Sequence, residues 1–72
     1  MMTTFTLYAA PTSQSDVQMG KDYESINAAR AALPAMMREW DEQCAEDDAR
    51  AADCLWYVRD NCTRQTVEVL HG

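Results

Sequence analysis

Basic residues, paired cysteines and long hydrophobic runs are scarce in this chain of 72 residues, and each shortage excludes a class of protein. Six lysines and arginines face twelve acids, which gives a formal net charge of -6. Because affinity for nucleic acids and anionic membranes comes from lysine and arginine, we expect direct binding to neither. No stretch approaches the ~18 consecutive apolar residues of a membrane span, so no membrane segment is expected.

Cysteine and histidine are too few, and too irregularly placed, for a metal site or a disulfide framework. Cys44, Cys54 and Cys62 are an odd number without a CxxC pair, and the one histidine is His71. Cys54 and Cys62 could pair across a hairpin; the alternative is that both are small apolar fillers in a reducing cytoplasm. The N-terminal segment MMTTFTLYAAPTS lacks the basic region of a secretory signal. We therefore expect a cytoplasmic protein without metal or cofactor.

The composition is that of a folded domain. Apolar residues make up 47% of the chain and charged residues 25%, which argues against intrinsic disorder. A chain of this length forms one small domain. We expect a single compact domain over residues 1–72.

The N-terminal part of the chain predicts a strand. Residues 3–9, TTFTLYA, alternate polar and apolar, which predicts a half-buried strand with Phe5 and Leu7 pointing inward. Tyr8 then points outward. Residues 17–19 would add at most a short second strand before the helical region.

Two helices are expected in the middle of the chain. Asp22 or Ser25 can cap the first, which runs to Leu33. Pro34 either begins a second helix or kinks a continuous one, and the helical pattern runs to about Ala52. The apolar residues on its predicted core face recur at helical spacing: Leu33, Met36, Met37, Trp40, Cys44 and Ala51.

Period-two patterning from Cys54 to Leu70 predicts a β-hairpin that turns at Asp60–Asn61. The residues expected to face inward are Cys54, Trp56, Val58, Val67 and Val69. Leu55 and Tyr57 then lie on the opposite face of the sheet. The predicted fold is α+β with two layers in the order β-α-α-β-β. Its antiparallel sheet has three or four strands, and both helices cover one face.

Acidic residues are concentrated on the predicted second helix. Residues 38–53 hold seven acids and two arginines, and so carry most of the net negative charge. Glutamates at helical spacing place their carboxylates about 5 to 6 Å apart, a spacing comparable to that of successive phosphates along a nucleic acid. The candidate partner-binding residues are Glu39, Asp41, Glu42, Glu46, Asp47 and Asp48. The alternative is a solvated helix face with ordinary ion pairs such as Arg38 with Glu42.

The outward side of the sheet is a second candidate surface. Tyr8, Leu55 and Tyr57 would form an exposed aromatic patch of the kind used in docking or dimerisation. A single strand with the opposite phase would instead place these side chains in the core.

No arrangement of residues predicts catalysis. General acid–base chemistry needs a carboxyl group in a desolvated cleft, whereas the acids here are expected on a convex helix. Cys44 has no histidine near it in the sequence that could activate the thiol. The acidic run AEDDAR lacks the glycine turn and alternating oxygen ligands of a calcium loop. We therefore expect a non-enzymatic protein.

Three segments define the plan of the chain: an opening strand TTFTLY, a helical segment DYESINAARAALPAMMREWDEQ and a closing hairpin CLWYVRDNCTRQTVEVL. A small acidic domain of this plan resembles inhibitors carried by phages and mobile elements, anti-CRISPR proteins in particular. The resemblance implies an inhibitor that works in a bacterial host. It would occupy the basic DNA-binding surface of a nucleic-acid-binding complex, such as a CRISPR surveillance complex or its nuclease.

Two functional hypotheses follow from these surfaces. In the first, the protein is such an inhibitor, a monomer or weak homodimer that uses its acidic helix face. In the second, it is a small cytoplasmic interaction or antitoxin-like module that dimerises through Tyr8, Leu55 and Tyr57, while the acidic helix is merely solvated.

Overall fold

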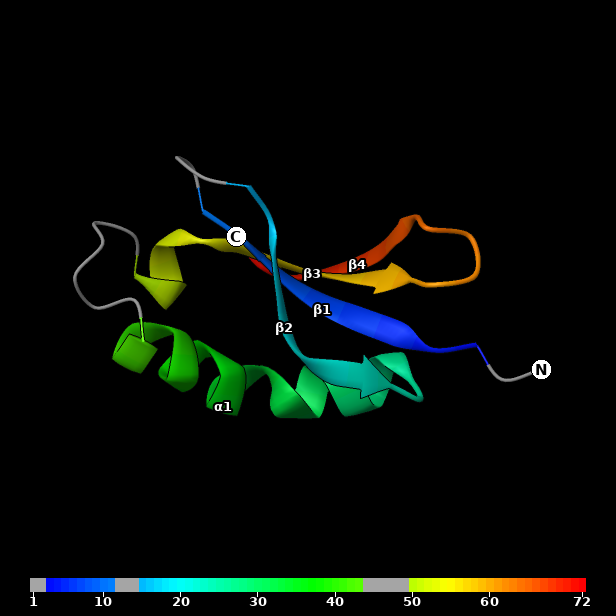
Figure 1. Ribbon diagram of the computed structural model, residues 1–72, viewed down its shortest axis with the longest axis horizontal. Coiled ribbons are helices and arrows are strands. Elements are labelled where there is room, and N and C mark those ends of the chain that lie inside the picture. Colours follow the sequence, from blue (N-terminus) through cyan, green and yellow to red (C-terminus); the bar gives the residue numbers. More distant parts are fainter. Residues whose placement is uncertain (1–2, 12–14, 44–49) are drawn as a thin grey trace.

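One four-stranded antiparallel sheet, covered on one face by one long helix, makes up the described part of the protein (Figure 1). The computed structural model describes residues 3–11, 15–43 and 50–72. The elements in chain order are β1 (Phe5–Ala10), β2 (Val17–Tyr23), α1 (Ile26–Gln43), the 3-10 helix η1 (Ala51–Asp53), β3 (Leu55–Asp60) and β4 (Thr66–His71). The strand order is β2-β1-β3-β4. The α+β prediction is confirmed. No helix among these residues is long and apolar enough to cross a membrane.

β2 is longer than the short segment expected at residues 17–19. Met19 pairs with Leu7 and Tyr23 pairs with Phe5, with an irregularity in register between them. Gly20 takes a φ of +74° within this irregularity, which is the left-handed region that favours glycine. A Cβ at Gly20 would lie 2.6 Å from the Tyr23 hydroxyl. The glycine therefore lets the strand bulge and return to the sheet, so the sheet has four strands.

α1 replaces the two helices that the sequence predicted, and the two-helix prediction is wrong. The helix begins where expected, since the Ser25 hydroxyl accepts a hydrogen bond from the Ala28 amide at 3.0 Å and caps the first turn. Pro34 lies inside the helix on its exposed side. It removes one backbone hydrogen bond, but Leu33 before it and Met37 after it both pack against the core. Core contacts on both sides hold the helix together across the proline.

The predicted continuation of the helix to Ala52 is also wrong. α1 ends at Gln43, and Arg50 is extended, with φ -87° and ψ 159°. The Ala51 amide donates to the Asp41 carboxylate at 2.8 Å, and the Ala51 carbonyl accepts from the Trp56 indole N–H at 2.8 Å. These bonds hold a tight turn that redirects the chain into β3. Cys44, one of the predicted core residues, falls outside the described residues.

The core lies between α1 and the sheet. Trp40 from α1 and Trp56 from β3 meet edge to face, with ring centroids 6.2 Å apart. The buried apolar residues are Leu7, Ala9, Met19, Ala29, Trp40, Ala51, Cys54, Trp56 and Val58. This set confirms the inward phase predicted for β1 and β3.

The phase predicted for β4 is wrong. Val67 and Val69 were expected in the core, but their side chains are 42% and 54% exposed. Leu70 packs against the core instead, and Glu68 forms an ion pair with Arg30 of α1. Two irregularities in the β3–β4 register change which β4 residues face the helix.

The two described cysteines do not pair with each other. Cys54 is buried next to the start of β3, whereas Cys62 is exposed in the turn that follows the strand. The strand between them is roughly 20 Å long at ~3.3 Å per residue, and a disulfide needs Cα atoms within about 7 Å.

Candidate functional site

The sheet face that points away from α1 is the best-defined candidate surface. We call it the open face and define it by Tyr8, Leu55, Tyr57, Val67 and Val69. Tyr57 pairs with Tyr8 on one side and with Val69 on the other, so a row of side chains crosses β1, β3 and β4. Leu55, at 40% exposure, continues this apolar surface along β3. Within the described ranges the one α-helix lies on the other side of the sheet (Figure 1).

Tyr8 and Tyr57 form the centre of the open face. Their rings are stacked, with centroids 5.4 Å apart and planes 13° from parallel. Directly opposed residues on neighbouring strands are close enough for such contact. Both side chains are half-buried, so each ring keeps solvent-accessible area for a partner.

Arg59 and Asp16 hold this tyrosine pair at its two ends. The Arg59 guanidinium carbon lies 4.5 Å from the centroid of the Tyr8 ring, and Arg59 Nη2 donates to the Tyr8 hydroxyl. The Tyr57 hydroxyl donates to Asp16 Oδ2. Each ring is therefore fixed by a charged group as well as by the other ring.

The hydrogen bond to Asp16 also changes the acidity of Tyr57. Partial burial raises the pKa of Tyr57, and both the hydrogen bond to Asp16 and the negative charge of that carboxylate raise it further, to about 12. Arg59 acts in the opposite direction and lowers the pKa, but with a smaller effect. The Tyr57 hydroxyl stays protonated and keeps donating across the neutral pH range.

Three of the acidic residues predicted to bind a partner, Glu39, Asp41 and Glu42, lie at the C-terminal end of α1. Glu39 accepts a hydrogen bond from Gln43 Nε2 at 3.0 Å, and Asp41 accepts the Ala51 amide, so both take part in internal contacts. Glu42 is exposed. Among the described residues, Arg38 and Glu42 do not form the ion pair that a solvated helix face would favour. Glu46, Asp47 and Asp48 fall outside the described residues.

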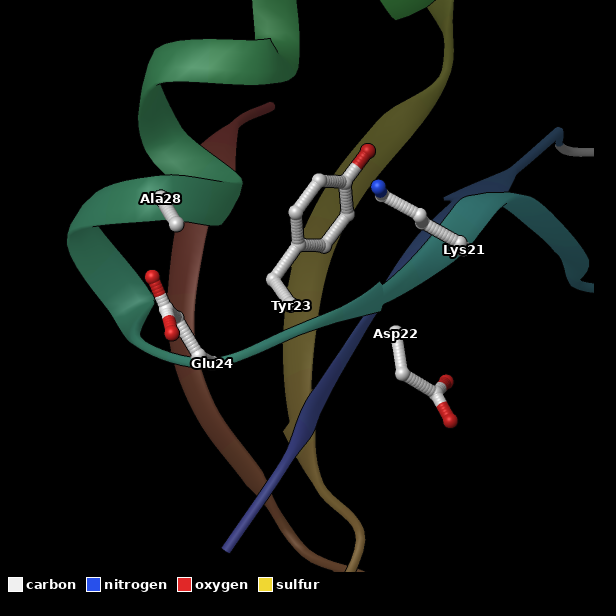
Figure 2. Close-up of a pocket in the computed structure, with 5 residues that line it drawn as sticks. All are labelled: Lys21, Asp22, Tyr23, Glu24 and Ala28. Atoms are coloured by element: carbon white, nitrogen blue, oxygen red, sulfur yellow. The ribbon is translucent and has the colours of Figure 1, made fainter. Parts of the chain in front are cut away.

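A shallow pocket of about 380 Å³ lies where β2 meets the start of α1. It is lined by Lys21, Asp22, Tyr23, Glu24 and Ala28 (Figure 2). Figure 2 shows the Lys21 ammonium group and the Tyr23 hydroxyl lying toward each other, with Asp22 turned away. The Asp22 carboxylate lies 2.9 Å from the Thr6 hydroxyl, which can donate to it.

The pocket brings together ionisable side chains but no nucleophilic thiol or hydroxymethyl group. Burial, and to a smaller extent the Glu39 carboxylate, raises the pKa of Tyr23. Its lining holds no cysteine, serine or histidine. No group of three or more His, Cys, Asp or Glu side chains in the described part of the chain could hold a metal ion.

Sequence reasoning placed Tyr8, Leu55 and Tyr57 on one surface, and the structure brings them together there. It missed Val67 and Val69, because the irregular β3–β4 register is not visible in the alternation of residues. It also missed Asp16 and Arg59 as the groups that fix the tyrosines. The available signal was the outward-facing tyrosine on each of β1 and β3, because half-buried tyrosine hydroxyls need polar partners nearby.

Comparison with known proteins does not extend this description. No protein-family model, no curated protein and no solved structure matches the chain. Function must therefore be argued from the two surfaces.

Proposed function

We propose that the protein is a non-enzymatic protein-binding domain whose docking surface is the open face. The observation that carries the proposal is the row of Tyr8, Tyr57 and Val69 across three strands, flanked by exposed Leu55 and Val67. Aromatic side chains are enriched in interfaces because they bring large apolar area together with a polar group. Apolar side chains gathered on one face of so small a domain favour a binding role.

Fixed side chains strengthen this proposal. Ordering a flexible side chain at an interface costs about 0.5 to 1.5 kcal/mol. Tyr8 and Tyr57 are already ordered by their stacking, by Arg59 and by Asp16. A partner that packs on them therefore gains contact area without that cost, as expected of residues that dominate the energy of an interface.

The test compares three forms of the protein as bait in a bacterial lysate. Val69→Lys places a charge in the open face at a side chain that is 54% exposed. Ala31→Lys adds the same charge at an exposed position of α1 and is the matched control. We expect an identified partner to be retained by the wild type and by Ala31→Lys, and to be lost with Val69→Lys.

Circular dichroism on all three proteins establishes that they are equally folded. Reconstitution of the complex from the purified partner and each purified form of the protein then measures the loss of affinity directly. Equal binding by Val69→Lys and the wild type would show that the open face is not the docking surface.

The acidic region at residues 38–53 supports a second candidate function. Residues 38–53 carry seven acids and two arginines, and such a field attracts and orients a basic partner. The protein would then inhibit a nucleic-acid-binding complex, for instance a CRISPR surveillance complex or nuclease, by occupying its basic surface. Glu42, which is exposed, would contact that surface together with the other acids of this region.

A charge reversal tests the second candidate. Changing Glu42 and Glu46 to lysine together should abolish binding at low salt, and high salt should weaken binding by the wild type. Retention of the partner by this double variant at low salt would exclude the acidic region at residues 38–53 as the contact surface. Because the Val69→Lys variant alters β4 and the Glu42→Lys/Glu46→Lys variant alters the acidic region at residues 38–53, the two functions are separable.

A further inference from the structure

We infer that the partner of the open face is a second copy of this chain. The inference rests on the proposed function, because it names the occupant of the same surface. Two sheets would pack with their open faces together, and an α1 helix would cover the outside of each. The contact would be the same patch on both copies, as in twofold dimers.

The distribution of charge favours a second copy over a basic partner at this surface. Residues 55–72 hold two arginines and two acids, so β3, β4 and their turn carry no net charge, and the whole net charge of -6 lies in the rest of the chain. The five residues that define the open face are all uncharged. A lysine-rich protein would gain little electrostatic energy there.

The charged groups next to the open face are already in contact with groups of the same chain. Arg59 donates to Tyr8, Asp16 accepts from Tyr57, and Asp22 lies within hydrogen-bond distance of Thr6. These partners within the chain lower the cost of burying the charged groups against a second copy. Neutral, self-complementary packing is the chemistry that this surface offers.

The geometry also removes the main objection to self-association of an acidic protein. Face-to-face sheets pack about 10 Å apart, and a helix layer adds about 10 Å on each side, so the two α1 helices would be separated by about 30 Å. The Debye length at physiological salt is about 8 Å. Repulsion between the acids on the two α1 helices is therefore largely screened.

The size of the face indicates a weak dimer. Four strands spaced ~4.8 Å apart, each of about six residues at ~3.3 Å, give a face of roughly 20 by 20 Å, or about 400 Å² per copy. Two copies would bury about 800 Å², less than the ~1,200 Å² at the lower end of stable complexes. We expect reversible dimerisation in the micromolar range or weaker.

Sedimentation velocity over the micromolar to millimolar range tests the inference. The mass should rise with concentration from the 8.2 kDa of one chain toward twice that value. Val69→Lys should weaken the dimer at least about tenfold, because it buries an unpaired charge. Ala31→Lys, which adds the same charge on α1, should leave the dissociation constant unchanged. High salt should preserve or strengthen the dimer, because an apolar contact persists while the repulsion is screened.

Val67→Lys is a second variant, should Val69→Lys fail to fold, since Val67 is 42% exposed. A protein that stays monomeric into the millimolar range would overturn the inference, as would a dimer unaffected by both lysine variants. If the monomer nevertheless binds another protein in a manner that requires Val69, the second copy is excluded and the docking function stands. A dimer that dissociates at high salt would indicate contacts between acidic and basic groups instead, and would also overturn the inference.

Discussion

Tyr57 connects the parts of the open face. Its ring stacks on Tyr8, its backbone pairs with Val69, and its hydroxyl donates to Asp16. A change at this residue therefore alters aromatic contact, sheet packing and a charged hydrogen bond together. For that reason Val69, which touches fewer of these interactions, is the cleaner position for testing binding.

Tyr57 should ionise late in an alkaline titration. Its pKa lies at about 12 rather than at the ordinary 10.0, chiefly because of burial and the Asp16 carboxylate. The folded pKa is above the unfolded one, so the stabilisation is complete below about pH 10 and is lost as the pH rises toward about 12. Tyrosinate absorbance should show a late phase to which Tyr57 contributes together with Tyr23, whose pKa is also raised. The urea midpoint should fall over the same pH interval.

Two variants check this assignment. Tyr57→Phe should reduce the amplitude of the late absorbance phase by the share of one tyrosine and reduce the fall of the urea midpoint. Asp16→Asn should move the phase to lower pH, because the carboxylate charge that opposes ionisation is gone. A late phase of unchanged amplitude in Tyr57→Phe would assign it to a different tyrosine.

Single residues were predictable from the sequence where strand alternation alone decides their position. Leu7, Trp56 and Val58 are buried, and Tyr57 lies on the other face, as expected. The partners of the tyrosine hydroxyls were not predictable, because Asp16 lies 41 residues from Tyr57 and Arg59 lies 51 residues from Tyr8 in the sequence. Only the sheet register brings them together.

α1 is the element in which a local rule and the tertiary contacts disagree. Proline in a helix interior costs about 3 kcal/mol relative to alanine, and the sequence therefore favoured a break at Pro34. The apolar side chains on both sides of the proline contact the same core. Their packing is worth more than the hydrogen bond that the proline removes.

Replacing the proline should stabilise the protein. Pro34→Ala restores the missing backbone donor at an exposed position. It also increases the conformational freedom of the unfolded chain, which offsets up to about 1 kcal/mol of this stabilisation. We therefore expect the free energy of unfolding to rise by about 2 kcal/mol. Urea unfolding followed by circular dichroism measures the change.

Ala31→Gly is the matched comparison for the helix. It lies at an exposed position of the same element and should lower the free energy of unfolding by about 1 kcal/mol. If Pro34→Ala instead destabilised the protein, the proline would have to support a bend that the packing of α1 requires.

The elements of the sheet show what sequence patterns leave out. Periodicity located β1, β3 and β4, but it could not show that Gly20 extends β2 through a bulge. It also could not give the phase of β4, where both faces of the strand carry apolar residues and the register with β3 decides between them. The error in β4 moved two valines from the expected core to the open face.

The stability of the whole molecule depends on a small core. A domain of this length is expected to be stable by roughly 4 to 11 kcal/mol. Trp40 is buried at 4% exposure and packs edge to face against Trp56. Its side chain is the main contribution of the C-terminal part of α1 to the core.

Trp40→Ala should therefore remove a large share of the total stability. Truncating a buried tryptophan costs about 3 to 5 kcal/mol, so the variant should be partly or fully unfolded at moderate temperature. Thermal unfolding followed by circular dichroism measures this, with Glu42→Ala, at an exposed site of the same helix, as the control. A small change in Trp40→Ala would mean that the sheet is stable without the helix end.

The strand order β2-β1-β3-β4 has a consequence for how the chain folds. Two hairpins, β1–β2 and β3–β4, each close locally. The pairing of β1 with β3, which we call the central seam, joins Tyr8 to Tyr57, residues far apart in the chain. Closing the long loop between β1 and β3 costs chain entropy before the contacts of the central seam can stabilise the fold. We expect the docking of the two hairpins to limit the folding rate. Substitutions at the seam should then slow folding, whereas those confined to one hairpin should mainly speed unfolding.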